Sequence, residues 1–170
     1  MKKPRNRFLF YAAIGLILGV LDWFYLDWLA HLSWGALGQS MFVVPSILIM
    51  NYGVWLVPVL PIAIYAARHA DRVVAPVIAS VVTWVCAMIG YYGFYALQLS
   101  LGKLPSYEHL SLFAEKYPGF WLDYWRMFNR VIFSQFLQWT LIAVVCGSIL
   151  GAIIYKIFRP KPGVVINHQP

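Results

Sequence analysis

The sequence contains long stretches without charged residues. No Asp, Glu, Lys or Arg occurs in the ranges 8–21, 28–67, 73–102 and 131–155. Charged side chains are unfavourable in hydrocarbon, and about 20 helical residues cross its thickness of about 30 Å. Only 11% of the 170 residues are charged and 62% are hydrophobic, whereas soluble domains carry about 25% charged residues. This composition excludes an ordinary soluble domain, a disordered chain and a disulfide scaffold, and it predicts an all-α polytopic membrane protein embedded in a lipid bilayer.

The number of crossings depends on the stretch from Trp28 to Ala67, which is long enough for one crossing or two short ones. With one crossing there, both termini lie on the same side of the membrane, and that side holds nine of the 13 Lys and Arg residues. These nine are Lys2, Lys3, Arg5, Arg7, Arg68, Arg72, Lys156, Arg159 and Lys161. Basic residues accumulate on the cytoplasmic side of membrane proteins. We therefore predict a multi-pass protein of the cell membrane with cytoplasmic N and C termini.

The predicted architecture is one integral membrane domain, residues 1–170, with a bundle of four transmembrane helices at about 8–29, 41–67, 73–98 and 131–157. The basic start followed by apolar residues also fits a secretory signal, but bulky residues follow without a clear cleavage site, which favours retention as the first helix. The outer loop, 99–129, is amphipathic and predicts two interfacial helices, the second at 120–130 before the last crossing. Trp and Tyr residues at the outer ends of the helices predict an aromatic belt.

Several polar residues fall in or near the outer halves of the predicted crossings. Asp22 lies about 21 Å into the first helix, past the membrane centre. Polar residues elsewhere form possible partners for it, and together they define a candidate outward-facing, ligand-binding cavity. The candidate cavity residues are Asp22, Asp27, His31, Asn51, Arg126, Arg130 and Gln138. An intramembrane carboxylate needs a partner, water or a proton. The alternative is that Asp27 pairs with Arg130 and that Asp22 bonds a neighbouring side chain, with no ligand.

Small residues recur at helical spacing in the first and last predicted helices. The candidate packing residues are Gly15, Gly19, Ala143, Gly147 and Gly151. Residues of this size let membrane helices approach closely, so both helices are expected to make tight contacts, within one copy or between copies. Cys86 and Cys146 fall at matching depth, and two buried thiols fit this placement better than a bridge.

No catalytic motif, phosphate-binding loop, metal-ligand spacing or haem-ligand histidine occurs in the sequence. We therefore expect no cofactor and no metal. The basic flanks account for the net charge of +7 through topology and anionic lipid, without nucleic acid. The favoured hypothesis is a non-enzymatic accessory subunit, bound to a membrane-protein partner, or a self-associating homo-oligomer. The alternatives are a small carrier or solute-binding component, and an enzyme acting on a lipid-linked substrate. In the enzyme, Asp22 or Asp27 would be the acid or base and Arg126 or Arg130 would hold an anionic headgroup.

Overall fold

A computed structural model describes residues 4–36, 49–50, 53–101 and 118–159, and the side chains of residues 4–6, 27 and 30–36 lie outside this description. The described part is all-α. Its elements are α1 (Pro4–Ala36), α3 (Leu56–Arg68), α4 (Val74–Ser100), α5 (Phe120–Met127), the π-helical segment η2 (Phe128–Phe133) and α6 (Ser134–Phe158).

Three helical segments are long and apolar enough to cross a membrane: Arg7–Leu26, Val74–Ser100 and Phe120–Phe158. The mean hydropathy of an 18-residue stretch within each segment is 1.9, 1.9 and 2.3, respectively. The fourth apolar helix, Leu56–Arg68, has 13 residues and is therefore about 20 Å long, which is short of the hydrocarbon thickness. The remainder of the predicted second crossing, including 41–48, lies outside the described residues. The prediction of an all-α protein with several helices that could cross a membrane is confirmed, by their length and composition.

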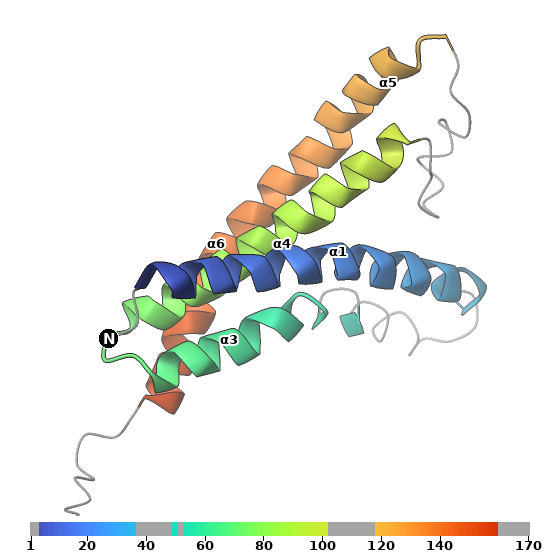
Figure 1. Ribbon diagram of the computed structural model, residues 1–170. Helices are drawn as coiled ribbons and strands as arrows, with labels where there is room; N and C mark the ends of the chain where they lie inside the picture. Colours follow the sequence, from blue (N-terminus) through green and yellow to red (C-terminus); the bar gives the residue numbers. More distant parts are fainter. Residues whose placement is uncertain (1–3, 37–48, 51–52, 102–117, 160–170) are drawn as a thin grey trace, which may run out of the picture.

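Helix α4 is the centre of the bundle. It packs against α1, α3 and α6. Half of the residues in its apolar 18-residue stretch are buried, compared with 33% in the corresponding stretch of α1 and 22% in that of the last segment. Figure 1 shows the chain running back and forth, so that the N-terminal end of α1 and the C-terminal end of α6 lie at the same end of the bundle. We call this the proximal end, and the end where α4 stops and α5 starts the distal end.

Polar contacts and a cation–π contact close the proximal end. The Tyr155 hydroxyl of α6 donates a hydrogen bond of 2.8 Å to the carbonyl oxygen of Asp71, in the turn between α3 and α4. The Arg68 guanidinium at the end of α3 lies 5.6 Å from the ring centre of Phe158, a distance at which a cation is attracted to an aromatic face. These contacts hold the turn and the end of α3 against α6.

The segment 120–130 does not form a separate interfacial helix, and this prediction is wrong. It continues through η2 into α6 as one helical segment of 39 residues, about 58 Å long, and Figure 1 shows α5 in line with α6. Neither Pro nor Gly interrupts the sequence from Phe120 to Phe133. The amphipathic pattern therefore indicates a helix, but nothing in this sequence ends the helix before α6. The break lies earlier, at Gly119, whose φ of 97° is left-handed and suits glycine.

Helix α1 is also longer than predicted. It continues to Ala36, although the sequence predicted that the first helix ends at about residue 29. Its 33 residues correspond to about 50 Å. The sequence from Trp23 to Trp34 contains no Pro or Gly, and its aromatic and polar side chains are compatible with continued helix.

Candidate functional site

Asp22 lies on the face of α1 that packs against α4. Gly15, Gly19, Asp22, Leu26 and Leu29 recur at intervals of three or four residues, and all five are buried. Residues at this spacing share one face of a helix. Asp22 itself is only 6% exposed. The helix therefore carries the carboxylate into the protein interior and not toward lipid.

Contacts between α1 and α4 show which turn of α4 lies at the level of Asp22. A Cβ atom at Gly19 would meet the backbone of Ala87, and one at Gly90 would meet the backbone of Leu16. One helical turn farther along, the rings of Trp23 and Phe94 lie 5.2 Å apart. Asp22 is thus level with the turn of α4 that runs from Gly90 to Phe94.

Aromatic side chains surround this level of the bundle. The ring of Trp55, just before α3, meets the ring of Tyr91 edge to face at 5.3 Å. Tyr91 in turn meets the rings of Tyr92 at 5.0 Å and Tyr95 at 6.5 Å. These four residues belong to one buried cluster, which also contains Trp23 of α1. Asp22 therefore lies at a level of the bundle that is rich in buried aromatic side chains.

Asp22 lacks a structural partner in the described part of the chain. Its Oδ2 atom is buried and has no hydrogen-bond partner there. The ion pair found among the described residues joins Arg126 to Asp123, at 3.2 Å on the surface of α5, and does not involve Asp22. A buried ionised carboxylate without compensation is unfavourable by several kcal/mol. Asp22 therefore needs a proton, a water molecule or a cation from outside these residues.

The other candidate cavity residues are not gathered around Asp22 in the described structure. The side chains of Asp27 and His31, and Asn51 as a whole, lie outside the described residues. Arg126, Arg130 and Gln138 are exposed. Figure 1 shows that α5 and the distal half of α1 diverge. The geometry that an enzyme would need, with Asp22 beside an arginine, is absent from the described part.

The glycines of the first and last predicted helices lie against α4. A Cβ at Gly147 would lie 3.4 Å from the Cα of Val81, and one at Gly151 would lie 2.6 Å from the Cα of Val77. Gly15 and Gly19 contact α4 as well. Ala143 of α6 is buried in the core. The four glycines therefore contribute to contacts within one copy of the chain.

Sequence reasoning missed the matching residues on α4. Thr83 and Ala87 lie against the glycines of α1, and Gly90 lies against the backbone of Leu16. Their spacing of four and three residues is the same small-residue signal. The buried tyrosine cluster was also missed, because alternation of Tyr with apolar residues does not show which face of a helix is buried. The expectation of two buried thiols is wrong for Cys146, which is exposed, while Cys86 is half-buried; both cysteines are free.

No group of three or more His, Cys, Asp or Glu side chains that would hold a metal ion occurs among the residues described here. No family model matches the sequence, and no curated protein or solved structure is significantly similar to it. The candidate site must therefore be interpreted from its own chemistry.

Proposed function

We propose that this chain is a small multi-pass membrane protein that binds a positively charged solute at Asp22, as a carrier or as the binding component of one. The observation that supports the proposal is the buried Oδ2 atom of Asp22, without a hydrogen-bond partner among the described residues. An intramembrane carboxylate is expensive to keep and typically marks an ion, proton or ligand pathway. A bound cation would compensate its charge.

The surroundings of Asp22 favour an organic cation over a small metal ion. Trp23, Trp55 and Tyr91 belong to the buried cluster at this level, and aromatic faces attract cations that lie within about 6 Å of the ring centre. Small metal ions instead require several oxygen or nitrogen ligands, and the described residues supply no such group. One carboxylate among aromatic rings matches a solute with one positive charge and apolar substituents.

A binding experiment with tetraphenylphosphonium as the organic cation tests the proposal. The purified protein in detergent is titrated while tryptophan fluorescence is recorded, because Trp23 and Trp55 lie in the cluster. We expect saturable binding by the unmodified protein and at least a tenfold weaker affinity for Asp22→Asn, which keeps the shape of the side chain but removes its charge. Binding should also weaken as the pH is lowered, because protons compete for the same carboxylate.

Asp123→Asn is the matched control, since Asp123 is a carboxylate on α5 that pairs with Arg126 at the surface. This variant should bind tetraphenylphosphonium as the unmodified protein does. Equal affinity of Asp22→Asn and the unmodified protein would refute the proposal. Uptake of the same cation into proteoliposomes then distinguishes a carrier from a binding component that does not transport.

A second candidate function is a non-enzymatic subunit that contacts another membrane protein or a second copy. It is favoured by the apolar surface of α5, where Trp121, Leu122 and Trp125 are 57%, 60% and 56% exposed. The segment containing α5 is about 58 Å long, so it exceeds the hydrocarbon thickness of about 30 Å and part of this surface projects beyond it. A photo-crosslinking residue at Leu122 should then capture a protein, and capture of lipid alone would remove this candidate.

The proposed orientation places both termini in the cytoplasm. The common position of the two helix ends in Figure 1 supports their lying on one side, and the excess of basic residues supports the cytoplasmic side. Reporter fusions at each end test this orientation. Two reporters active on the cytoplasmic side are expected, and reporters on opposite sides would contradict it.

A further inference from the structure

The helices packed around Asp22 bring no opposite charge to its level within the described part of the chain. Helix α4 carries no Asp, Glu, Lys or Arg from Val74 to Ser100. Helix α3 has one charged residue, Arg68, at its last position. Toward the start of α1, the nearest charged side chain that the structure describes is Arg7, about 22 Å away along the helix axis. The charge of Asp22 must therefore be compensated by something that enters from outside these helices.

The other titratable groups of α3 and α4 do not supply this compensation. They are Cys86, Tyr91, Tyr92 and Tyr95 of α4 and Tyr65 and Arg68 of α3. Tyrosine and cysteine side chains are largely uncharged near neutral pH, and Arg68 lies over the ring of Phe158 at the proximal end. Among the described residues, the net charge at this level thus depends on whether Asp22 holds a proton or a bound cation.

Close backbone contacts separate Asp22 from the proximal end along the α1–α4 interface. A Cβ at Gly19 would meet the backbone of Ala87, and one at Gly15 would meet the carbonyl oxygen of Thr83. Helices this close leave no room between them for a solute. A solute bound at Asp22 can pass along this interface only if α1 and α4 move relative to each other.

The charge of Asp22 decides whether such a movement is favourable. An ionised carboxylate without a partner is unfavourable in the membrane interior. A protonated carboxyl group is neutral, and so is a carboxylate paired with a monovalent cation. The two helices can therefore move while Asp22 holds a proton or a cation, whereas the empty, ionised state opposes the movement.

We propose that Asp22 exchanges one proton for one monovalent organic cation, which makes the chain a proton-coupled exchanger. This inference rests on the proposed function, because it assigns the coupling ion of the same site. As the cation binds on one side of the membrane, the O–H bond of the carboxyl group breaks and the proton leaves to water. On the other side the cation leaves, and a proton from water restores the O–H bond. Each cycle exchanges one positive charge for another, so a pH gradient alone drives it.

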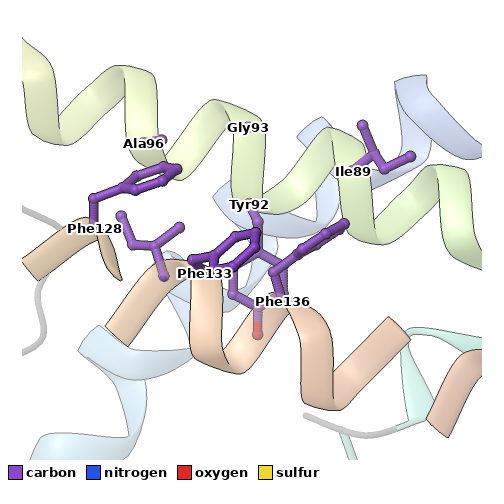
Figure 2. A pocket seen from close by; sticks show the side chains of 8 residues that line it. Ile89, Tyr92, Gly93, Ala96, Phe128, Phe133 and Phe136 are labelled. Carbon is purple, nitrogen blue, oxygen red and sulfur yellow. The ribbon is translucent and has the colours of Figure 1, made fainter. Parts of the chain in front are cut away.

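An apolar groove on another face of α4 provides a control position. Its volume is about 210 Å³. Figure 2 shows it between α4, which contributes Ile89, Gly93 and Ala96, and the last helical segment, which contributes Phe128 and Phe133. A Cβ at Gly93 would meet nothing within 4 Å. Gly93→Leu therefore adds a side chain to α4 without changing its contact with α1.

Proton release on binding of tetraphenylphosphonium tests the exchange directly. The purified full-length protein is mixed with a saturating concentration of this cation in weakly buffered detergent solution, between about pH 5 and pH 9, a range that covers the charge change of a buried carboxyl group. Released protons are measured with a pH indicator and bound cation by tryptophan fluorescence. We expect close to one proton per bound cation at the acidic end, and a decrease toward zero at the alkaline end, where Asp22 is already ionised.

Asp22→Glu keeps a carboxyl group and should also release protons, whereas Asp22→Asn should release none. Gly93→Leu and the surface variant Asp123→Asn should behave as the unmodified protein does. Binding without proton release over the whole pH range, or equal release by Asp22→Asn and the unmodified protein, would overturn the exchange and leave the proposed binding function intact. Absence of tetraphenylphosphonium binding would refute both, so the two failures are distinguishable.

Proteoliposomes test whether the exchange drives transport. With an acidic interior and the membrane potential clamped at zero, the unmodified protein should accumulate tetraphenylphosphonium at least tenfold over vesicles without protein. Asp22→Asn should accumulate no more than those vesicles do. A protein that binds the cation but does not accumulate it under this pH gradient would contradict the proposed coupling.

Discussion

The two main interfaces of α4 use the same small residues with different results. Along α1, the contacts of Gly15 and Gly19 are followed by a buried, aromatic-rich level of the bundle that contains Asp22. Along α6, the contacts of Gly147 and Gly151 end at a groove that opens to the surroundings. Close helix approach therefore does not by itself determine what an interface encloses. The residues that follow the glycines differ between the two helices. In α1 the next buried residue on this face is Asp22, whereas the last helical segment contains the π-helical turn η2.

The largest expected effect comes from closing the space at the α1–α4 contact. A Cβ at Gly19 meets the backbone of Ala87, which has no flexible end to move away. Gly19→Leu should lower the free energy of unfolding by about 3 kcal/mol or more, at or above the upper end of the usual overpacking effects. Reversible unfolding in mixed detergent micelles measures the change. Gly93→Leu is the control and should fold normally, since a Cβ there meets nothing within 4 Å.

A smaller effect is expected at the proximal α4–α6 contact. A Cβ at Gly151 would lie 2.6 Å from the Cα of Val77, so Gly151→Ala forces the helices apart and should lower the free energy of unfolding by about 1–3 kcal/mol. The same unfolding assay applies. If Gly151→Ala lowered the free energy of unfolding as much as Gly19→Leu does, the two interfaces would tolerate added side-chain atoms equally poorly. That result would contradict the difference described between them.

The smallest effect is expected at Gly147. Its Cβ would lie 3.4 Å from the nearest atoms of Val81, close to ordinary van der Waals contact. Gly147→Ala should therefore change the free energy of unfolding by less than about 1 kcal/mol, because the higher helix propensity of alanine offsets the slight crowding. A loss above about 2 kcal/mol would show that α4 and α6 lie closer together than described.

The sequence was sufficient to predict the helical membrane class and the approximate positions of two crossings. The predicted helices at 73–98 and 131–157 correspond to Val74–Ser100 and Ser134–Phe158, because uninterrupted apolar stretches have few alternatives in lipid. The continuation of α5 into α6 was not predicted. An amphipathic stretch indicates that a helix has a polar side, but it gives no information on whether the helix turns at the membrane surface.

The candidate site was predictable only in part. The position of Asp22 in a long apolar stretch identified it as unusual, but its partners depend on helix rotation. Arg130 and Gln138 follow a polar spacing in the sequence, yet they are exposed while Asp22 is buried. The tyrosines of α4 carry no charge and no motif, so their association with Trp55 depends on three-dimensional packing.

The most direct measurement is the free energy of unfolding of Asp22→Leu and Asp22→Asn compared with the unmodified protein. The bundle buries Asp22, and its Oδ2 atom has no hydrogen-bond partner among the described residues. Replacing an unsatisfied buried polar group by an apolar one removes its desolvation penalty of about 1–3 kcal/mol, so Asp22→Leu should be at least as stable as the unmodified protein. A loss of more than about 2 kcal/mol in Asp22→Leu, with recovery in Asp22→Asn, would show that the side chain is a hydrogen-bonded structural element and would contradict the account.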